Sequence, residues 1–350
     1  MLEVDNREAR LLEAVVAASF LATYGQLCVG WDYWRKASTI LCNAVTISRR
    51  LHLTDNASPV FSSGELSDRD ISTRSALVSY MFLIDTMQAT HCGLASNFST
   101  SELFIRMPGS NHQFRTIYSS LLHGEKIPQD VRSREDALLL LTALLSDVVF
   151  MQRCLPLAAS DFGSSHKRRT KSSPFTPLSA GSEFSRLNAV MAAALSRWEH
   201  HFSQCQVGND ILALYYFCQL QLICPDTWKL PQMAGYGETM ELNDYNNGNV
   251  QIPAISSEHS LEVSEKAVAL AWLVLDHCHK KPLDSKLSVW LPVIVFLSAL
   301  LIWQKVRAES ATAPRYGILR VLGVFKDEIA SYPWPCSGEM IKTLDRLMDS

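Results

Sequence analysis

The chain of 350 residues is 47% apolar and 19% charged, and its formal net charge is −3 at pH 7. This composition supports a large buried core and excludes overall disorder. The near-neutral charge gives no reason to expect nucleic acid or an anionic membrane as a direct partner. Nine cysteines are scattered without any C-x-x-C pair, which indicates a reducing compartment and argues against a disulfide framework or a structural zinc site.

Helical periodicity dominates the first 158 residues. Apolar residues recur at steps of three and four while polar residues fill the opposite side, as in amphipathic helices. We expect helices over residues 8–27, 33–53, 72–91 and 133–155. Residues 1–158 are therefore predicted to form a first helical lobe.

The composition changes between residues 159 and 183, where Gly, Ser and Pro replace the apolar repeat and predict a surface linker. Within this linker the stretch HKRRTK is a compact basic cluster, followed by Ser-Pro and Thr-Pro pairs. One interpretation is a nuclear import signal flanked by phosphorylation sites, and the alternative is a solvated basic loop. The candidate import residues are Lys167, Arg168, Arg169 and Lys171.

Helical periodicity resumes in residues 184–350, which are predicted to form a second lobe with an irregular loop at 228–256. We expect helices over residues 183–205, 209–224, 260–280, 287–303, 315–330 and 337–350. The sequence contains no run of alternating strands. The predicted fold is all-α, an irregular multi-helix bundle in two coupled helical lobes.

Residues 287–303, LSVWLPVIVFLSALLIW, form an apolar run that raises the question of a membrane. Seventeen residues is the short limit for crossing about 30 Å of hydrocarbon. Length therefore favours a buried core helix, and a membrane is not an expected partner. A membrane-associated helical protein anchored by this run is the alternative.

The stretch from Tyr80 to Pro108 contains a lone acid, Asp85, inside an apolar helical run. A buried carboxylate is costly unless it is paired or protonated. Arg74 shares its face but lies three turns away, about 16 Å along the axis. We therefore expect Asp85 to find partners on another helix or among backbone N–H groups.

The end of the same helix carries signals for stopping and restarting. Gly93 stands where a helix C-terminus favours a residue with positive φ, and Ser99 to Glu102 have the spacing of a capping box. His91 and Cys92 point about 100° apart on a helix, the wrong arrangement for a thiol and its base. These features predict an architectural role for the stretch, with no catalytic residue.

Residues 34–55, WRKASTILCNAVTISRRLHLTD, and the stretch from Arg74 to Pro108 together resemble the middle homology region of fungus-specific transcription factors. In that family a helix with a tryptophan leads into a small-residue, Leu-Gly-Leu-like end. After a polar spacer come a pair of arginines, an aromatic pair, an aspartate, a Gly-Arg-Pro turn and an acidic segment that ends in proline. His52 occupies a position where glycine often sits, and Val78, Ser79, Leu94 and Ala95 depart from the pattern. The positions that match, all within residues 7–110, are Trp34, Arg74, Asp85, Gly93 and Pro108.

The resemblance implies a regulatory, non-catalytic domain that works in the nucleus, with shuttling from the cytoplasm allowed. Its implied partners are the transcription machinery or another transcription factor, with a dimer and a small-molecule effector as further options. The family's zinc-cluster or finger module has no matching cysteine spacing here. We therefore expect no cofactor and no direct nucleic-acid binding from this chain, and zinc only in a separate N-terminal module.

Two pairs of residues have the spacing of partial metal sites. His201 and Cys205 are separated by four positions, and Asp276 and His279 by three. Two ligands on one helix leave a tetrahedral site two ligands short, so no metal residue is assigned. A helical enzyme that gathers Asp85, His201 and Asp276 is a second alternative to the regulatory domain.

Overall fold

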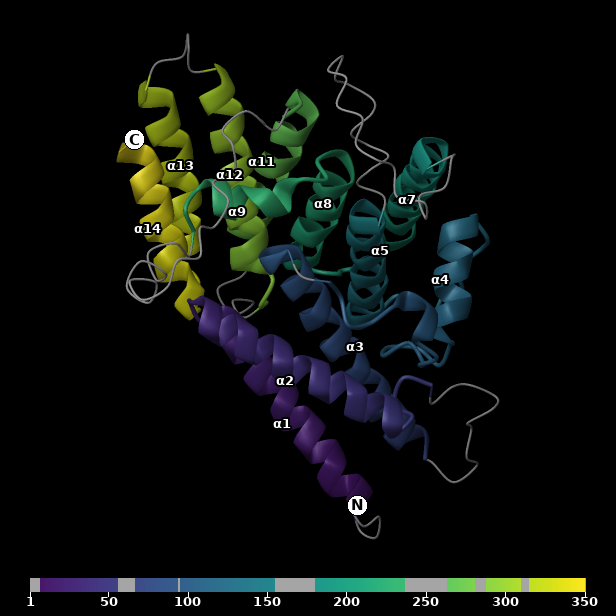
Figure 1. The fold of residues 1–350 in the computed structure, drawn as a ribbon. Coiled ribbons are helices and arrows are strands. Elements are labelled where there is room, and N and C mark those ends of the chain that lie inside the picture. Colours follow the sequence, from purple (N-terminus) through teal and green to yellow (C-terminus); the bar gives the residue numbers. More distant parts are fainter. Residues whose placement is uncertain are drawn as a thin grey trace.

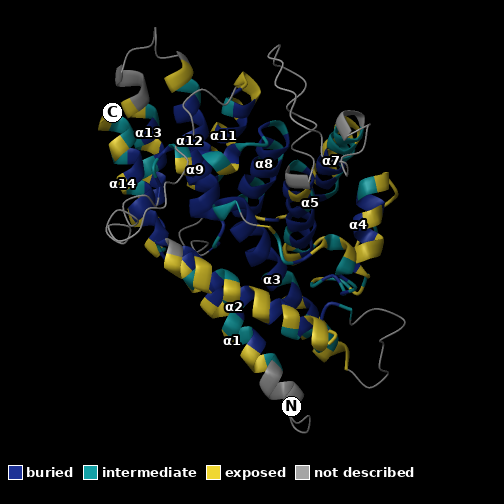
Figure 2. Cartoon of the chain, viewed as in Figure 1, coloured by how far each residue is buried: buried dark blue, intermediate teal, exposed yellow. Residues whose placement is uncertain are grey.

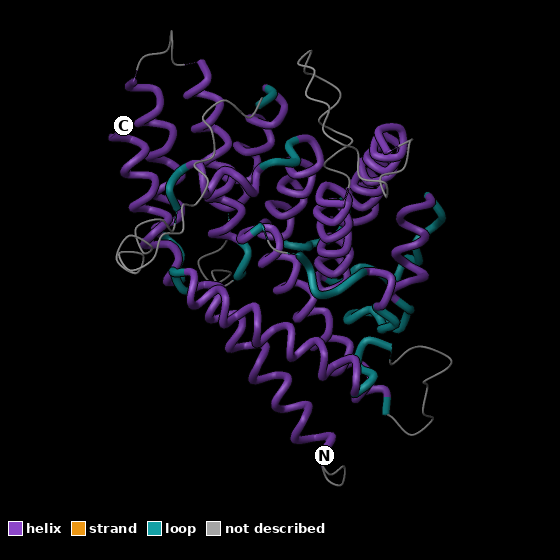
Figure 3. The backbone as a smooth tube through the Cα atoms, in the orientation of Figure 1, coloured by secondary structure: helices purple, strands orange, loops and turns teal. Residues whose placement is uncertain are grey.

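Helices make up all the regular structure in the part of the chain that the computed structural model describes: residues 7–55, 67–93, 95–154, 180–236, 263–280, 288–309 and 315–349 (Figure 3). This confirms the all-α prediction. The α-helices are α1 (Arg7–Leu27), α2 (Trp31–Arg50), α3 (Asp68–Cys92), α4 (Phe114–His123), α5 (Arg134–Cys154), α7 (Ala180–Phe202), α8 (Asn209–Ile223), α9 (Leu230–Met233), α11 (Glu265–His279), α12 (Leu291–Glu309), α13 (Arg315–Ala330) and α14 (Pro335–Asp349). Two 3₁₀ turns are η1 (Thr100–Glu102) and η3 (Thr227–Lys229).

Most of the helices form a row in which each packs against the next (Figure 1). The order along the row is α4, α7, α5, α8, α11, α12, α13 and α14. The hairpin of α1 and α2 runs beneath the row in Figure 1, and α3 packs against both of its helices and against α5. The hairpin is tight because Gly25 has no side chain: a Cβ there would lie 2.9 Å from the Cβ of Ala37.

Three helices have stretches of two or more turns that are buried on every side. These are residues 81–91 of α3, 139–146 of α5 and 291–304 of α12 (Figure 2). The stretch Leu291–Ala308 is long and apolar enough to cross a membrane, and 78% of it is buried against the rest of the protein. The apolar run at 287–303 thus supplies a central helix of this core.

The hydrophobic core continues across the two predicted lobes. From the first lobe, α5 packs on α7 and α8 of the second, and the indole N–H of Trp198 donates to the Ala137 carbonyl at 3.1 Å. The carboxylate of Asp210, at the start of α8, is 3% exposed and bonds the Arg134 guanidinium and the Ser288 hydroxyl. Nothing in these contacts tests the lobe boundaries, which stay a prediction.

The structure differs from the sequence expectations at three places. Helix α7 begins at Ala180, inside the predicted linker 159–183, while residues 155–179 lie outside the described part. The predicted loop 228–256 overlaps η3 and contains the short helix α9, whose Pro231 suits the first turn because it needs no N–H partner there. Helix α4 was not predicted, because its ten residues carry only a short apolar repeat.

The end of α2 imposes an unusual backbone on His52. Its φ of 53° makes it the one residue other than glycine with positive φ in the described ranges. The His52 N–H donates to the Arg49 carbonyl at 3.1 Å and the Leu53 N–H to the Ser48 carbonyl at 2.9 Å. This is the hydrogen-bond pattern of a Schellman motif, which favours glycine at the left-handed position.

Replacing His52 by glycine is expected to stabilise the protein. The change relieves about 1–2 kcal/mol of left-handed strain, which exceeds the roughly 0.4–1 kcal/mol by which glycine's flexibility favours the unfolded chain. Urea unfolding should show a net gain of roughly 0.5–1 kcal/mol for His52→Gly. Lys36→Gly, on the exposed side in the interior of α2, is the control and should lose about 0.5–1 kcal/mol; a loss at both positions would contradict the argument.

Candidate functional site

Residues 95–113, between α3 and α4, contain the 3₁₀ turn η1 but no α-helix, and they pack against the core. They are called the clamped segment. Leu103, Ile105 and Met107 are 0–2% exposed, and the residues between them point outward. This alternation is that of an extended chain with one face on the core. The N–H of Met107 donates to the His112 carbonyl at 2.8 Å, so the segment folds back on itself.

Asp85 of α3 holds the first part of the clamped segment. The side chain is 1% exposed, and one carboxylate oxygen accepts from the backbone N–H groups of Asn97 and Phe98 at 2.7 and 2.9 Å. The other oxygen accepts from Asn97 Nδ2 at 2.7 Å. Burial raises the pKa of Asp85, and these hydrogen bonds partly oppose that rise. The predicted backbone partners are thereby confirmed.

Two further carboxylates, both on α5, hold the rest of the segment. Asp147 accepts from the Thr100 hydroxyl at 2.8 Å and the Tyr118 hydroxyl at 2.7 Å. Asp136 accepts from the Gly109 N–H at 2.8 Å. Burial raises the pKa of both carboxyl groups. Sequence reasoning missed both contacts. Asp147 is an acid in an apolar helical run, the signal that singled out Asp85, whereas Asp136 lies in the first turn of α5, where an acid is an ordinary helix start signal.

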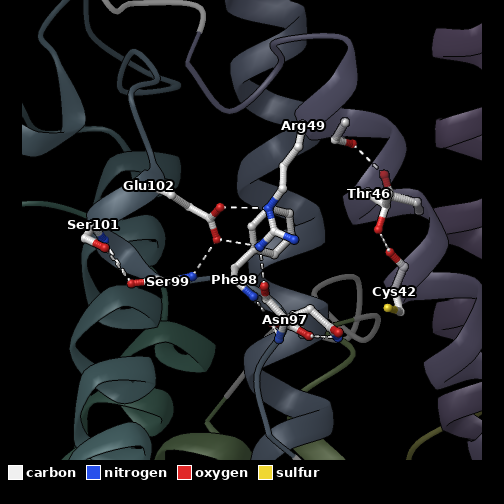
Figure 4. Close-up of polar contacts among 11 residues, drawn as sticks. Cys42, Thr46, Arg49, Asn97, Phe98, Ser99, Ser101 and Glu102 are labelled. Carbon is white, nitrogen blue, oxygen red and sulfur yellow. Dashed lines mark hydrogen bonds and ion pairs between the residues drawn. The ribbon is translucent and has the colours of Figure 1, made fainter.

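An ion pair closes the outer side of the clamped segment (Figure 4). Arg49 of α2 binds both carboxylate oxygens of Glu102 at 2.8 Å and donates to the Asn97 carbonyl at 2.6 Å. Glu102 also accepts from the Ser99 N–H at 2.8 Å, which completes the predicted capping box. Asn97 is thus held by two residues. Arg49 binds its backbone carbonyl, and Asp85 binds its backbone N–H and its side-chain amide.

The arrangement determines what these acids can do chemically. Buried carboxyl groups with raised pKa values are often functional. Here both oxygens of Asp85 and both of Asp147 accept hydrogen bonds from the protein itself. Asp85 holds mainly backbone, whereas Asp147 holds the hydroxyl groups of Thr100 and Tyr118. Asp136 retains one buried oxygen without a hydrogen-bond partner.

The other motif residues also have structural surroundings. Gly93 ends α3 with φ of 67°, as predicted, and a Cβ there would lie 3.1 Å from the Trp228 ring. Trp34 is 5% exposed and donates to the Cys28 carbonyl at 2.9 Å. Arg74 lies near the start of α3. The hydrogen bond from the Ser67 hydroxyl is the main reason that the pKa of Asp70 is lowered, and the charge of Arg74 adds to this effect. Pro108 is half-buried in the clamped segment.

The predicted import residues Lys167, Arg168, Arg169 and Lys171 lie outside the described residues. His201 is within 2.8 Å of the Val131 carbonyl, and Asp276 pairs with Lys280 at 2.5 Å. Asp85, His201 and Asp276 therefore each have separate partners. In the described ranges no three His, Cys, Asp or Glu side chains are placed to hold a metal ion.

Comparison of the chain with family models, with curated proteins and with solved structures found no match. The resemblance to the fungal regulatory domain therefore stays a hypothesis that depends on the motif residues.

Replacing Asp85 by asparagine is expected to destabilise the protein. Asparagine offers one acceptor oxygen where Asp85 offers two, and its amide N–H groups face other donors. Denaturant unfolding should show a loss of about 1–3 kcal/mol, the usual cost of buried polar groups left without partners. Asp32→Asn is the control: Asp32 pairs with Arg35 on the surface, so a change of at most about 0.5 kcal/mol is expected there. Equal effects at both positions would refute the role of Asp85.

The contribution of Asp85 to the free energy of unfolding should also depend on pH. Because burial raises its pKa above the unfolded value of about 3.9, the folded state holds more protons than the unfolded state in the interval between the two values. The contribution of Asp85 to the free energy of unfolding therefore falls as pH rises through that interval. Wild type minus Asp85→Asn, measured by urea unfolding from about pH 4 upward, should show this fall. A difference that rises with pH would mean that the hydrogen bonds outweigh burial.

Proposed function

We propose that the chain is a regulatory, non-catalytic domain of the kind found in fungal transcription factors, and that it changes transcription through protein contacts. The observation that carries the proposal is the left-handed backbone of His52. The family that the sequence resembles often has glycine at this position, and glycine is the residue that such a backbone favours. A turn of the same shape would explain the family's preference.

The roles of the motif residues also support a scaffold. Trp34 packs in the core, Asp85 holds the clamped segment, and Gly93 ends α3 against Trp228. Each has a structural explanation that requires no substrate. A helical enzyme would need Asp85, His201 and Asp276 to share a ligand, and their separate partners give that alternative no support.

Helix α1 offers the surface for a protein contact. Ala14, Ala17, Phe20, Leu21 and Tyr24 lie on one exposed stripe, and the three large side chains are 60–62% exposed. No charged residue occurs between Ala14 and Tyr24. This stretch therefore offers no charge that could pair with an acidic or a basic partner. The stripe spans about three turns and fits the apolar face of an amphipathic helix from a protein partner.

The membrane alternative depends on α12. Because 78% of its apolar span is buried among neighbouring helices, little of it is left to face lipid in this fold. This favours the interpretation of α12 as a core helix and of α1 as the contacting surface.

The proposal is tested by fusing the whole chain to an unrelated DNA-binding module and measuring transcription of a reporter with its site in a fungal host. The fusion should change transcription relative to the module alone. Leu21→Lys should abolish that change because it places a charge on the apolar stripe of α1, whereas Asn43→Lys, on the exposed side of α2, should not.

The possible outcomes test the regulatory function and the proposed contact surface on α1 independently. An unchanged reporter with a folded, DNA-bound fusion would refute the regulatory function. A normal response of the Leu21→Lys fusion would refute only the α1 surface. Microscopy of the same fusion tests nuclear import: deletion of residues 167–171 should reduce nuclear accumulation, and unchanged accumulation would leave the basic cluster as a solvated loop.

A further inference from the structure

A small cavity of about 20 Å³ lies between α1, the end of α3 and the start of α12. Most of its wall is apolar, with Leu27, Ile84 and Val293 among the lining residues. Polar side chains line it too, and two of them, Gln88 and His91, stand three positions apart on α3. Residues with this spacing lie on the same face of a helix.

Each of these two side chains has a buried nitrogen without a hydrogen-bond partner among the described residues. The atoms are Nε2 of Gln88, which is 3% exposed, and Nε2 of His91, which is 6% exposed. The amide oxygen of Gln88 is used, because it accepts from Gln26 Nε2 at 3.1 Å. Buried polar atoms are hydrogen-bonded in the great majority of native proteins, and ordered water is a common partner where protein atoms are missing.

The chemistry of the cavity restricts what fills it. Burial lowers the pKa of His91 to about 4, so the ring is neutral at pH 7, and no other lining side chain carries a charge. An ion would have no counter-charge there. A volume of about 20 Å³ exceeds the roughly 10–15 Å³ that one water molecule requires and is too small for a metabolite.

We propose that this cavity is a hydration site that holds one ordered water molecule. The water accepts a hydrogen bond from Gln88 Nε2 and forms a second with His91 Nε2. Since Gln88 also binds Gln26 of α1, the water extends a polar link from α1 along the last turns of α3. The inference is independent of the proposed regulatory function.

The direct test is water-selective NOE spectroscopy on the isotope-labelled full-length protein. The side-chain amide protons of Gln88 should show a cross-peak to a long-lived water, and this peak should disappear in Gln88→Met. Absence of the peak in the folded wild-type protein would overturn the proposal.

Paired substitutions give a second test based on the sign of a stability change. His91→Phe keeps a ring between Trp34 and Tyr236, whose centroids are 5.3 and 5.6 Å away, but removes the atom that binds the water. Tyr236→Phe is the matched control, because its buried hydroxyl also lacks a partner and it does not line the cavity. With water present, His91→Phe should lower Tm, while Tyr236→Phe leaves it unchanged or raises it. A raised Tm for both variants would indicate a dry cavity.

Discussion

A carboxylate that leaves water must receive hydrogen bonds or give up its charge, and this constraint links α3, α4 and α5 through the segment between them. Asp85, Asp136 and Asp147 have no salt-bridge partner among the contacts described above, and each accepts from residues between Asn97 and Tyr118. The clamped segment supplies most of these donors because it is extended, and an extended chain leaves its N–H groups without helical partners. The buried carboxylates therefore need the hydrogen-bond donors of the clamped segment, and the same hydrogen bonds determine where this segment runs.

The same logic explains the helices that surround the segment. Residues 81–91 of α3 are buried on all sides, so Asp85 has no route to water. On the outer side Arg49 is partly exposed and pairs with Glu102 through two parallel hydrogen bonds, a geometry that suits the planar guanidinium. Asn97 is thus held by a buried residue, Asp85, and by a partly exposed one, Arg49. The contact with Asp85 excludes water, whereas the contact with Arg49 lies at the surface.

Much of this architecture was readable in the sequence because it depends on local chemistry. The all-α fold follows from apolar periodicity, Gly93 from its place after an apolar run, and the Ser99–Glu102 capping box from its spacing. What could not be read depends on contacts between distant residues. Asp147 meets Thr100 across 47 positions and Asp136 meets Gly109 across 27, and no spacing rule connects them. Helix α4 was missed for a related reason, since tertiary packing against α7 stabilises its short repeat.

The burial of α12 on every side has a consequence for biosynthesis. Its apolar residues 291–304 leave the ribosome after α1 to α11 and before α13, one of the helices that cover them. Until α13 emerges, the side of α12 that this helix covers is exposed on the nascent protein, although α8, α9 and α11 already pack against the rest of it. An exposed apolar face of this kind is a surface that chaperones recognise. Synthesis of α13 is thus the step that withdraws the remaining face of α12 from the solvent.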